Sequence, residues 1–407
     1  MTDFPVLGQV ALGYSPMIDR HKVVTALRLT IFPIRPEVQP DVDQLLAALA
    51  EAWPEPAHRL SLNIVGEGLL DALLRTDPPL NLMIEVPAFM ASDLACSDAL
   101  AALHTRGNTL LIKGRPLAPL PREVLPCFAY SIIDLADERR DGMPPPGGVS
   151  RNIPHVQAGV RTLAQMTEAF GRGAIAVLGW PIDDTAPATT TTTGTTTTTT
   201  RRGAQPELSA IVELINRVDR AEPIDRLEAV MKNDPTMAFK LMRYLNSAAF
   251  GLSVEVTSFR HAIMLLGYQR LKRWLALLLA AGSRDASMKP VIYAAVRRGL
   301  LMEELGRDSG ADDERRSELF VCGVFSLLDR LMQQPFDELL KSIPVTDAVR
   351  EALVHQRGPH QSYLALVQAI ESAALFDIRA ATEALMMTTS DVNRATLRAL
   401  VAARQLD

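Results

Sequence analysis

Hydrophobic residues in the first 180 positions form short β-like runs that alternate with helical stretches. This alternation is typical of a parallel sheet or barrel with helices outside, so the first half is predicted to be α/β. The expected strands are Val10–Tyr14, Val23–Phe32, Leu60–Ile64, Leu82–Val86, Thr109–Lys113 and Tyr130–Asp134, and the expected helices are Val42–Trp53, Val65–Leu74 and Ala91–Arg106.

The second half has the three-and-four spacing of amphipathic helices. A compact three-helix stretch is predicted from Asp234 to Leu275. Asp234 and Pro235 form a strong helix start, and Gly251 and Gly267 mark helix ends. Further helices are expected at Pro290–Leu305, Ser317–Gln333, Val345–His355, from near Gln361, at Asp377–Met387 and at Asp391–Ala403.

A low-complexity segment separates the two halves. Thr189 to Thr200 contains eleven threonines interrupted by Gly194, and it has no large apolar residue that could enter a core. An exposed linker is therefore predicted. The expected organisation is an α/β domain at residues 1–185, a linker at 186–205 and an all-α domain at 206–407.

Composition and charge narrow the function classes. The chain has 407 residues and a formal net charge of −5, with 17 basic and 21 acidic side chains in residues 1–205 and 25 and 26 in residues 206–407. Neither half has the basic excess of a protein that binds nucleic acid through phosphates, so nucleic acid is disfavoured as a partner. Arg270, Lys272 and Arg273 beside Trp274 form either a basic patch with an aromatic platform or, preferably, a solvated helix face with Trp274 turned inward.

No run of apolar residues is long enough to cross a membrane, and the first thirty residues lack the features of an export signal. The three cysteines are widely spaced and include no CxxC, which indicates neither a disulfide framework nor a zinc site. A cytoplasmic protein without a membrane segment is expected.

Two motifs of the helical half carry a family resemblance. LMRYLNSAAFG, residues 241–251, followed by SFRHAIMLLG, residues 258–267, resembles the HDOD domain, an all-helical module of bacterial signalling proteins related to the HD phosphohydrolases. The segment Glu318–Pro335 resembles the part of HD enzymes that carries adjacent His and Asp metal ligands. These two positions fall on Ser326 and Leu327, which cannot replace that pair, so metal-dependent hydrolysis is not expected in this domain.

A polar cluster interrupts the HDOD-like motif. Tyr244, Asn246 and Ser247 precede the small pair Ala248 and Ala249. Asn246 and Ser247 are predicted either to satisfy backbone groups near a helix end or to form an interaction face.

The first half resembles a worn EAL domain, the barrel that in active form hydrolyses cyclic di-GMP with two divalent metals. The resemblance runs in order through YSPMIDR, LSLNIVGEGLL, LMIEVP, GNTLLIKG, YSIID, VQAGVRT and GAIAVLGW, between residues 14 and 180. It implies a degenerate EAL-like (β/α) barrel followed by an HDOD helical domain.

Most of the catalytic groups of the EAL family are missing. The glutamate that names the family falls on Leu27, the aspartate pair on Lys113 and Gly114, and the catalytic lysine on Ile132. The glutamates of the AEGVE loop fall on Ala158 and Arg161, the final glutamine on Leu178, and the second glutamate of the ExTE strand on Ala88. Three polar matches remain: Asn63, Glu85 and Asp134. These residues are either strand-end hydrogen-bonding groups or remnants of a ligand site.

The sequence therefore predicts a non-catalytic signal-transduction protein that acts through protein–protein interaction, without a metal or cofactor. Its expected partners are other signalling proteins. The alternative is a receptor that binds cyclic di-GMP without cleaving it, with Arg28, Asn63, Arg115 and Arg161 as candidate contacts. A residual cyclic di-GMP phosphodiesterase based on Asn63, Glu85 and Asp134 is the least favoured reading.

Overall fold

The computed structural model describes residues 4–35, 37–53, 59–116, 120–136, 153–184, 206–232, 259–281 and 288–404. By their contacts the residues divide into two compact units. The barrel unit comprises Met1–Asp184 with Leu366–Leu397, and the helical unit comprises Thr185–Ala365 with Arg398–Asp407. The threonine-rich segment and residues 233–258 lie outside the described residues.

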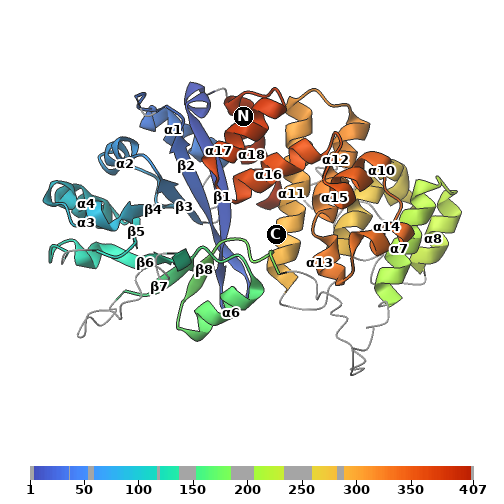
Figure 1. Cartoon of the computed structure of the whole chain (residues 1–407), viewed down its shortest axis with the longest axis horizontal. Coiled ribbons are helices and arrows are strands. Elements are labelled where there is room, and N and C mark those ends of the chain that lie inside the picture. Colours follow the sequence, from blue (N-terminus) through green and yellow to red (C-terminus); the bar gives the residue numbers. More distant parts are fainter. Residues whose placement is uncertain are drawn as a thin grey trace. The chain divides into compact units, whose positions relative to one another are not determined.

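The barrel unit contains a closed eight-stranded barrel whose strands follow one another in sequence order (Figure 1). The strands are β1 Val10–Asp19, β2 Val24–Pro33, β3 Arg59–Ile64, β4 Leu82–Pro87, β5 Thr109–Lys113, β6 Phe128–Asp134, β7 His155–Ala158 and β8 Ala176–Leu178. All six predicted strands are confirmed. The strands β7 and β8 were not predicted, because four and three residues are too few to show an alternating pattern.

The barrel is parallel except at its first strand. β1 pairs antiparallel with both β2 and β8, whereas the other neighbours are parallel. The turn from β1 to β2 is too short for a crossover, and Asp19 Oδ1 closes it by accepting from the amides of His21 and Val23 at 2.8 and 2.9 Å.

Helices follow several of the strands on the outside of the barrel. Their starts are encoded locally: Asp41 and Asp93 cap two helices, and Thr162 with Gln165 forms a capping box on a third. The helices of this part are α1 Val42–Ala52, α2 Glu67–Leu74, α3 Ala88–Ala91, α4 Leu94–Arg106 and α6 Leu163–Gly171, with 3-10 turns η1 Pro5–Gly8 and η2 Leu125–Cys127.

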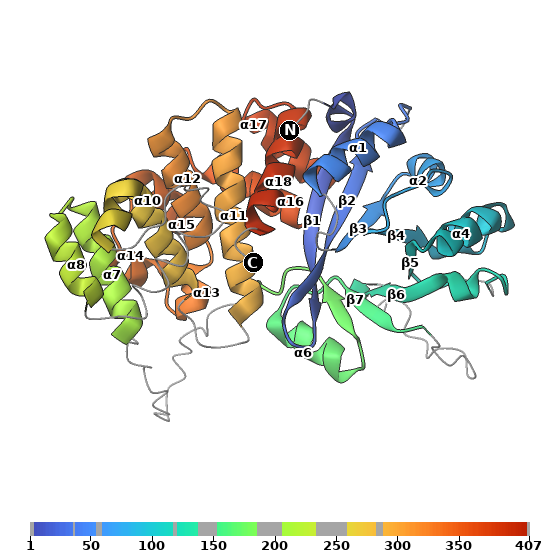
Figure 2. The same cartoon turned by 180° about the vertical axis from the view of Figure 1, so that it is seen from behind.

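The barrel unit also includes the C-terminal part of the chain. Residues 366–397 carry parts of α16 (Gln361–Glu371) and α18 (Thr389–Arg404) and all of α17 (Leu375–Ala384). Figure 1 and Figure 2 both show α17 and α18 beside β1. The buried side chain of Asn393 donates to the carbonyls of Leu7 and Val10, both at 2.7 Å, and accepts from Leu12 N at 3.2 Å. The predicted domain at 206–407 therefore differs from the observed division.

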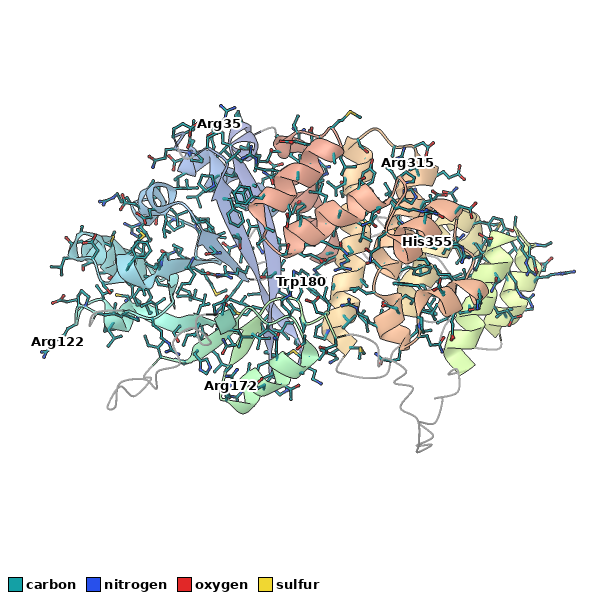
Figure 3. All side chains as sticks on the ribbon, in the orientation of Figure 1. Arg35, Arg122, Arg172, Trp180, Arg315 and His355 are labelled. Atoms are coloured by element: carbon teal, nitrogen blue, oxygen red, sulfur yellow. The ribbon has the colours of Figure 1, made fainter. Side chains whose placement is uncertain are left out.

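The same region packs closely against β1. A Cβ atom at Gly13 would lie 2.8 Å from Ala373 Cβ, so only glycine allows this approach of the backbones. Trp180, labelled in Figure 3, donates from Nε1 to Tyr14 O at 3.0 Å, and its ring meets that of Tyr14 edge to face at 5.6 Å. β1 therefore contacts two residues that are distant from it in sequence, Ala373 and Trp180.

The helical unit contains α7 Pro206–Asp219, α8 Ile224–Lys232, α10 Phe259–Ala281, α11 Lys289–Asp308, α12 Asp313–Phe325, α13 Leu328–Met332, α14 Phe336–Ser342 and α15 Asp347–His355. The predicted helix end at Gly267 is confirmed as a kink inside α10, where φ is 68° and ψ is 169°. The single helix predicted over Ser317–Gln333 is wrong, because the chain leaves helical geometry at Leu327 and forms α12 and α13.

Glycines allow α11 and α12 to pack closely. A Cβ atom at Gly323 would lie 2.6 Å from the backbone carbonyl of Arg298, and one at Gly299 would lie 2.6 Å from a methyl group of Val324. The backbones of the two helices therefore approach each other at these positions. Phe320 and Phe325 of α12 are fully buried in the same core.

Candidate functional site

The interior of the barrel has an apolar layer. Inward-facing residues from most strands form one buried cluster: Met17, Ala26, Met83, Leu111, Ile132, Val156, Ala158, Ala176 and Leu178. Ile132, Ala158 and Leu178 are three of the positions onto which the EAL resemblance places catalytic groups. These three apolar side chains belong to one packed hydrophobic cluster. In an active EAL domain, polar catalytic groups would occupy the same three positions.

A polar layer lies next to this cluster, and its centre is the Glu85 carboxylate on β4. Glu85 is 0% exposed and forms a bidentate ion pair with Arg28 on β2, with Nε to Oε1 at 2.8 Å and Nη2 to Oε2 at 2.6 Å. Ser61 on β3 donates its hydroxyl to Glu85 Oε1 at 2.9 Å. Three donors thus compensate the buried charge.

The second part of the polar layer is centred on Asn63 at the end of β3. Lys113 Nζ on β5 donates to Asn63 Oδ1 at 2.6 Å, and Asn63 Nδ2 donates to Thr30 Oγ1 at 3.2 Å. Burial lowers the pKa of the Lys113 ammonium, while the Glu85 carboxylate acts in the opposite direction. The polar layer therefore carries two basic side chains, Arg28 and Lys113.

Asp134, the third predicted remnant, has a different role. Its Oδ1 accepts from Ala136 N at 2.7 Å just beyond the end of β6, and a Cβ atom at Gly159 would lie 2.9 Å from the same oxygen. The structure thus brings Asn63 and Glu85 into one hydrogen-bonded layer, whereas Asp134 holds the turn that follows its own strand.

These residues do not fit a pair of divalent metal ions. The oxygens of Glu85 are engaged by Arg28, and the ammonium of Lys113 lies on the oxygen of Asn63. Two basic side chains in the same layer would repel added cations. Within the described ranges, no three His, Cys, Asp or Glu side chains form a group that could hold a metal.

Arg28 was a candidate ligand contact from the sequence, but its ion pair with Glu85 was not predicted. The resemblance placed the family's glutamate on Leu27, but Ala26 faces the interior cluster and Arg28 reaches Glu85. Because side chains of a strand alternate, Leu27 lies on the opposite face. The signal was present in the sequence: Ala26, Arg28 and Thr30 form the small and polar half of the alternation, while Leu27, Leu29 and Ile31 form the apolar half.

The metal-ligand positions of HD enzymes are structural in the helical unit. Ser326 caps the end of α12, accepts from Arg298 Nη1 at 3.1 Å and donates to Gly323 O at 2.7 Å, while Leu327 is buried in the core. Among the residues that the structure describes, neither side chain belongs to a group of His, Cys, Asp or Glu that could hold a metal. The predicted interaction residues Asn246 and Ser247 lie outside the described residues.

The basic group of α10 forms a solvated face, as the preferred interpretation stated. Trp274 is buried, Lys272 donates to Asp219 at 2.5 Å, and Arg273 donates to Glu303 at 2.5 Å. With the aromatic ring turned inward, this surface lacks the platform on which a nucleotide base would stack.

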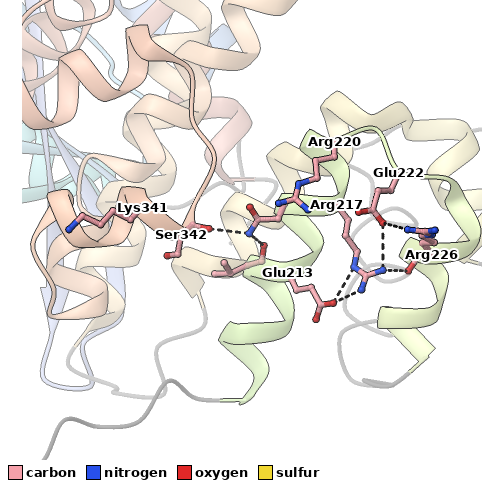
Figure 4. A pocket seen from close by; sticks show the side chains of 9 residues that line it. Glu213, Arg217, Arg220, Glu222, Arg226, Lys341 and Ser342 are labelled. Atoms are coloured by element: carbon pink, nitrogen blue, oxygen red, sulfur yellow. Dashed lines mark hydrogen bonds and ion pairs between the residues drawn. The ribbon is translucent and has the colours of Figure 1, made fainter.

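A solvent-exposed hollow is formed by α7, α8 and the end of α14, and Figure 4 draws the residues that line it. Its volume is about 580 Å³. Arg217 pairs with Glu213 at 2.5 Å and lies 3.6 Å from Glu222, which also lies 3.9 Å from Arg226. These pairs leave Arg220 and Lys341 of the lining without a carboxylate of the hollow.

Comparison with known proteins identifies the class. Residues 206–339 match the HDOD domain family, so this helical region is an HDOD domain. It follows the closed eight-stranded barrel. As the sequence predicted, the chain thus combines a barrel with an HDOD helical domain. The helices that the structure describes include none long and apolar enough to cross a membrane.

The particular relatives are bacterial. The chain is 30% identical over 167 residues to the uncharacterized protein YuxH of Bacillus subtilis (strain 168), covering 39% of this chain and 40% of YuxH. It is 27% identical over 175 residues to the cyclic di-GMP phosphodiesterase CdgJ of Vibrio cholerae serotype O1, covering 42% of this chain and 40% of CdgJ. The matches thus span less than half the length of each relative.

The solved structures that the comparison found include EAL proteins, at low TM-scores. The EAL enzyme Bd1971 in its cGMP-bound form has a TM-score of 0.32 and 14% identity, covering 42% of this chain and 60% of that one. A standalone EAL protein of Vibrio cholerae O395 with bound c-di-GMP has a TM-score of 0.29 and 15% identity, covering 44% and 92%. Both TM-scores are low.

Proposed function

We propose that the protein is a non-catalytic component of bacterial signal transduction that acts through protein–protein interaction. The observation that supports this proposal is the content of the barrel interior: Arg28 neutralises Glu85, Lys113 binds Asn63, and apolar side chains fill the remaining layer. Metal-dependent phosphodiester hydrolysis needs several converging carboxylates whose oxygens are available to bind metal. In this interior the oxygens of Glu85 are already paired with Arg28.

The HDOD domain is the proposed interaction module. Its metal-ligand positions, Ser326 and Leu327, are used for a helix cap and for the core. A helical domain without a catalytic set can still present a surface to another signalling protein. Asn246 and Ser247, from the sequence motif, remain the proposed interaction face.

The decisive experiment is a hydrolysis assay of the full-length chain. Purified protein is incubated with cyclic di-GMP, and separately with phosphomonoester and nucleotide substrates, in Mg²⁺ or Mn²⁺, beside an active EAL phosphodiesterase as positive control. No turnover above background is expected. Metal-dependent hydrolysis that disappears in Glu85→Gln would overturn the proposal, and the residual phosphodiesterase would take its place.

A second experiment addresses the interaction itself. The full-length chain and the Asn246→Ala/Ser247→Ala double variant are used as baits in parallel pull-downs from cells of the source bacterium. A partner captured by the wild type is expected to be lost or weakened in the variant, with unchanged circular dichroism. Equal capture by both chains would remove these two residues from the interaction face.

The alternative is a receptor that binds cyclic di-GMP without cleaving it. One observation favours this alternative: Arg115 and Arg161 follow β5 and β7, at the end of the barrel where the parallel strands finish, and Lys113 ends β5. Arg28 is already bound to Glu85, and Arg161 pairs with Asp183 at 2.6 Å. Calorimetry with cyclic di-GMP at about 100 µM decides this case, since a signalling receptor should show a micromolar Kd or tighter.

A further inference from the structure

A second cavity lies wholly within the helical unit, where the middle of α10, the end of α11 and the start of α12 meet. We call it the kink cavity, and its volume is about 420 Å³. It is lined by Gly267, Tyr268, Gln269, Arg270, Arg273, Glu303, Arg307, Asp313, Arg316 and Ser317. This volume is at the lower end of the range of small-molecule sites, roughly 300–1,000 Å³.

The walls of the kink cavity carry an excess of positive charge. Four arginines face two carboxylates, Glu303 and Asp313. Glu303 pairs with Arg273 at 2.5 Å, and Asp313 pairs with Arg316. The two remaining arginines, Arg270 and Arg307, are not neutralised by a carboxylate of the lining.

These two arginines differ in their surroundings. Arg307 pairs at 3.1 Å with Glu304, which is outside the lining and is shared with Arg398. Arg270 is exposed, and within the part of the chain that the structure describes it has no ion pair or hydrogen bond. Its guanidinium is therefore free to bind an anion from the cavity.

The backbone of α10 adds to the positive potential. At Gly267 the φ angle of 68° breaks the helix, so a new helix begins at Tyr268 and runs to Ala281. The first-turn amides of this helix, at Tyr268, Gln269 and Arg270, have no acceptor within it. These three residues line the cavity, and the positive end of the helix dipole lies there.

Two residues of the lining, Arg273 and Tyr268, are held by contacts with residues outside or across the cavity. The guanidinium of Arg273 lies 4.3 Å from the centroid of the Phe320 ring as well as on Glu303. Tyr268 donates its hydroxyl to Glu222 O at 2.8 Å, which fixes its ring at the cavity wall. Arg273 and Tyr268 are thus held at the cavity wall by other contacts, whereas Arg270 is free to move toward an anion.

We propose that the kink cavity binds the phosphate group of a small phosphomonoester. Arginine guanidinium groups bind phosphate by paired, charge-assisted hydrogen bonds, and the amides of a helix start bind the same group. The remaining volume accommodates the organic part of a small ester. This inference does not depend on the proposed function, because the cavity is far in sequence from the barrel residues that support that function.

The test is calorimetric titration of the full-length chain, at constant ionic strength, with inorganic phosphate and separately with adenosine 5′-monophosphate. Saturable binding is expected, and Arg270→Ala should weaken it about tenfold, since one charged donor is removed. The matched control is Arg220→Ala, an exposed arginine of the hollow in Figure 4, which should bind like the wild type. Circular dichroism confirms the fold of each variant.

The two probes separate the sources of the phosphate group. Tighter binding of the monophosphate ester supports the ester, and equal or tighter binding of inorganic phosphate assigns the cavity to the free ion and overturns the ester. Absence of saturable binding by both probes overturns the site altogether. Equal weakening by Arg270→Ala and Arg220→Ala also overturns it, because it would indicate a general effect of surface charge.

Discussion

Lys113 Nζ lies 2.6 Å from Asn63 Oδ1, in the layer of the barrel where the EAL resemblance places metal ligands. An ammonium group thus supplies the positive charge that the Asn63 oxygen would otherwise receive from a cation. Arg28 does the same for Glu85. Side chains of the chain itself therefore satisfy the oxygens of Asn63 and Glu85, and no added cation is needed.

Addition of divalent metal is expected to leave the thermal stability of the chain unchanged. A cation present at about a hundred times its Kd would stabilise a folded protein by roughly 2.7 kcal/mol, which a melting curve detects readily. The measurement compares the Tm of the full-length chain in EDTA with that in millimolar Mg²⁺ or Mn²⁺. A metal-dependent rise in Tm would show that a metal ion displaces Lys113 from Asn63 or Arg28 from Glu85.

Arg28→Ala is expected to lower the free energy of unfolding by about 3–5 kcal/mol, because it leaves the fully buried Glu85 carboxylate without its counter-ion. Urea unfolding measures this loss. Arg161→Ala is the control: its pair with Asp183 is exposed, with side-chain exposures of 72% and 39%, so the loss should be about 0–1 kcal/mol. Equal stability of the two variants would mean that Glu85 is compensated by other groups.

Gly323→Ala should destabilise the HDOD domain by several kcal/mol. The added Cβ atom would lie 2.6 Å from the backbone carbonyl of Arg298, so α11 and α12 must move apart, and overpacking of this kind costs about 1–3 kcal/mol or more. Gly171→Ala, at the end of α6, meets no atom within 4 Å and should be tolerated. Thermal unfolding of both variants tests the difference, and a fully stable Gly323→Ala would contradict the close approach.

Asn393→Ala is expected to destabilise the barrel unit by about 3 kcal/mol, because three buried backbone groups lose their partners at roughly 1–3 kcal/mol for each unsatisfied group. Hydrogen exchange of the β1 amides should increase in parallel. Asn216→Ala serves as control, since its side chain bonds two carbonyls in a partly exposed position, and should lose less than about 1 kcal/mol. Unchanged exchange at Leu12 would contradict the role of Asn393.

The free energy of unfolding is expected to depend on pH through His360. Burial lowers the pKa of His360 from its ordinary 6.5, against the hydrogen bond to Glu318 at 3.1 Å, and Arg315 also lowers it. The unfolded chain therefore takes up a proton first as the pH falls below 6.5, so stability decreases between 6.5 and the lower folded pKa.

The size of this effect is up to about 1.4 kcal/mol per pH unit within the window, for one proton. His360→Gln should flatten the decrease measured by urea unfolding, whereas His355→Gln, at the exposed position labelled in Figure 3, should leave it unchanged. The same slope in the wild type and in His360→Gln would show that another group titrates.

Sequence reasoning found the class of fold but not the chemistry of its interior. The strands β1 to β6 carry enough alternation to be recognised, and the motif order supplied the barrel and the HDOD domain. The inward side of β2 was misjudged by one residue, at Leu27 instead of Arg28, because aligned motifs do not fix which face of a strand looks inward. Glu85 and Arg28 were both candidate residues, but their ion pair was not predicted.

The division into units was beyond sequence reasoning for a different reason. The contact of Asn393 with Leu7 joins residues 386 positions apart, and no local pattern marks such a pair. The threonine-rich segment suggested a single domain boundary, with all the predicted helices of residues 206–407 in one domain. Helix periodicity reports that a face is buried, but it does not report which unit buries it.

The bond between Asn393 and the start of β1 has a consequence for the order of events during synthesis. The barrel unit draws on residues 1–184 and again on 366–397, so the HDOD segment at 206–339 is an insertion within it. A ribosome releases the first strand long before the residues that complete its surroundings. The HDOD domain can therefore fold before the last helices of the barrel unit are synthesised, and a chain truncated before them would leave Leu7, Val10 and Leu12 without the hydrogen bonds with Asn393.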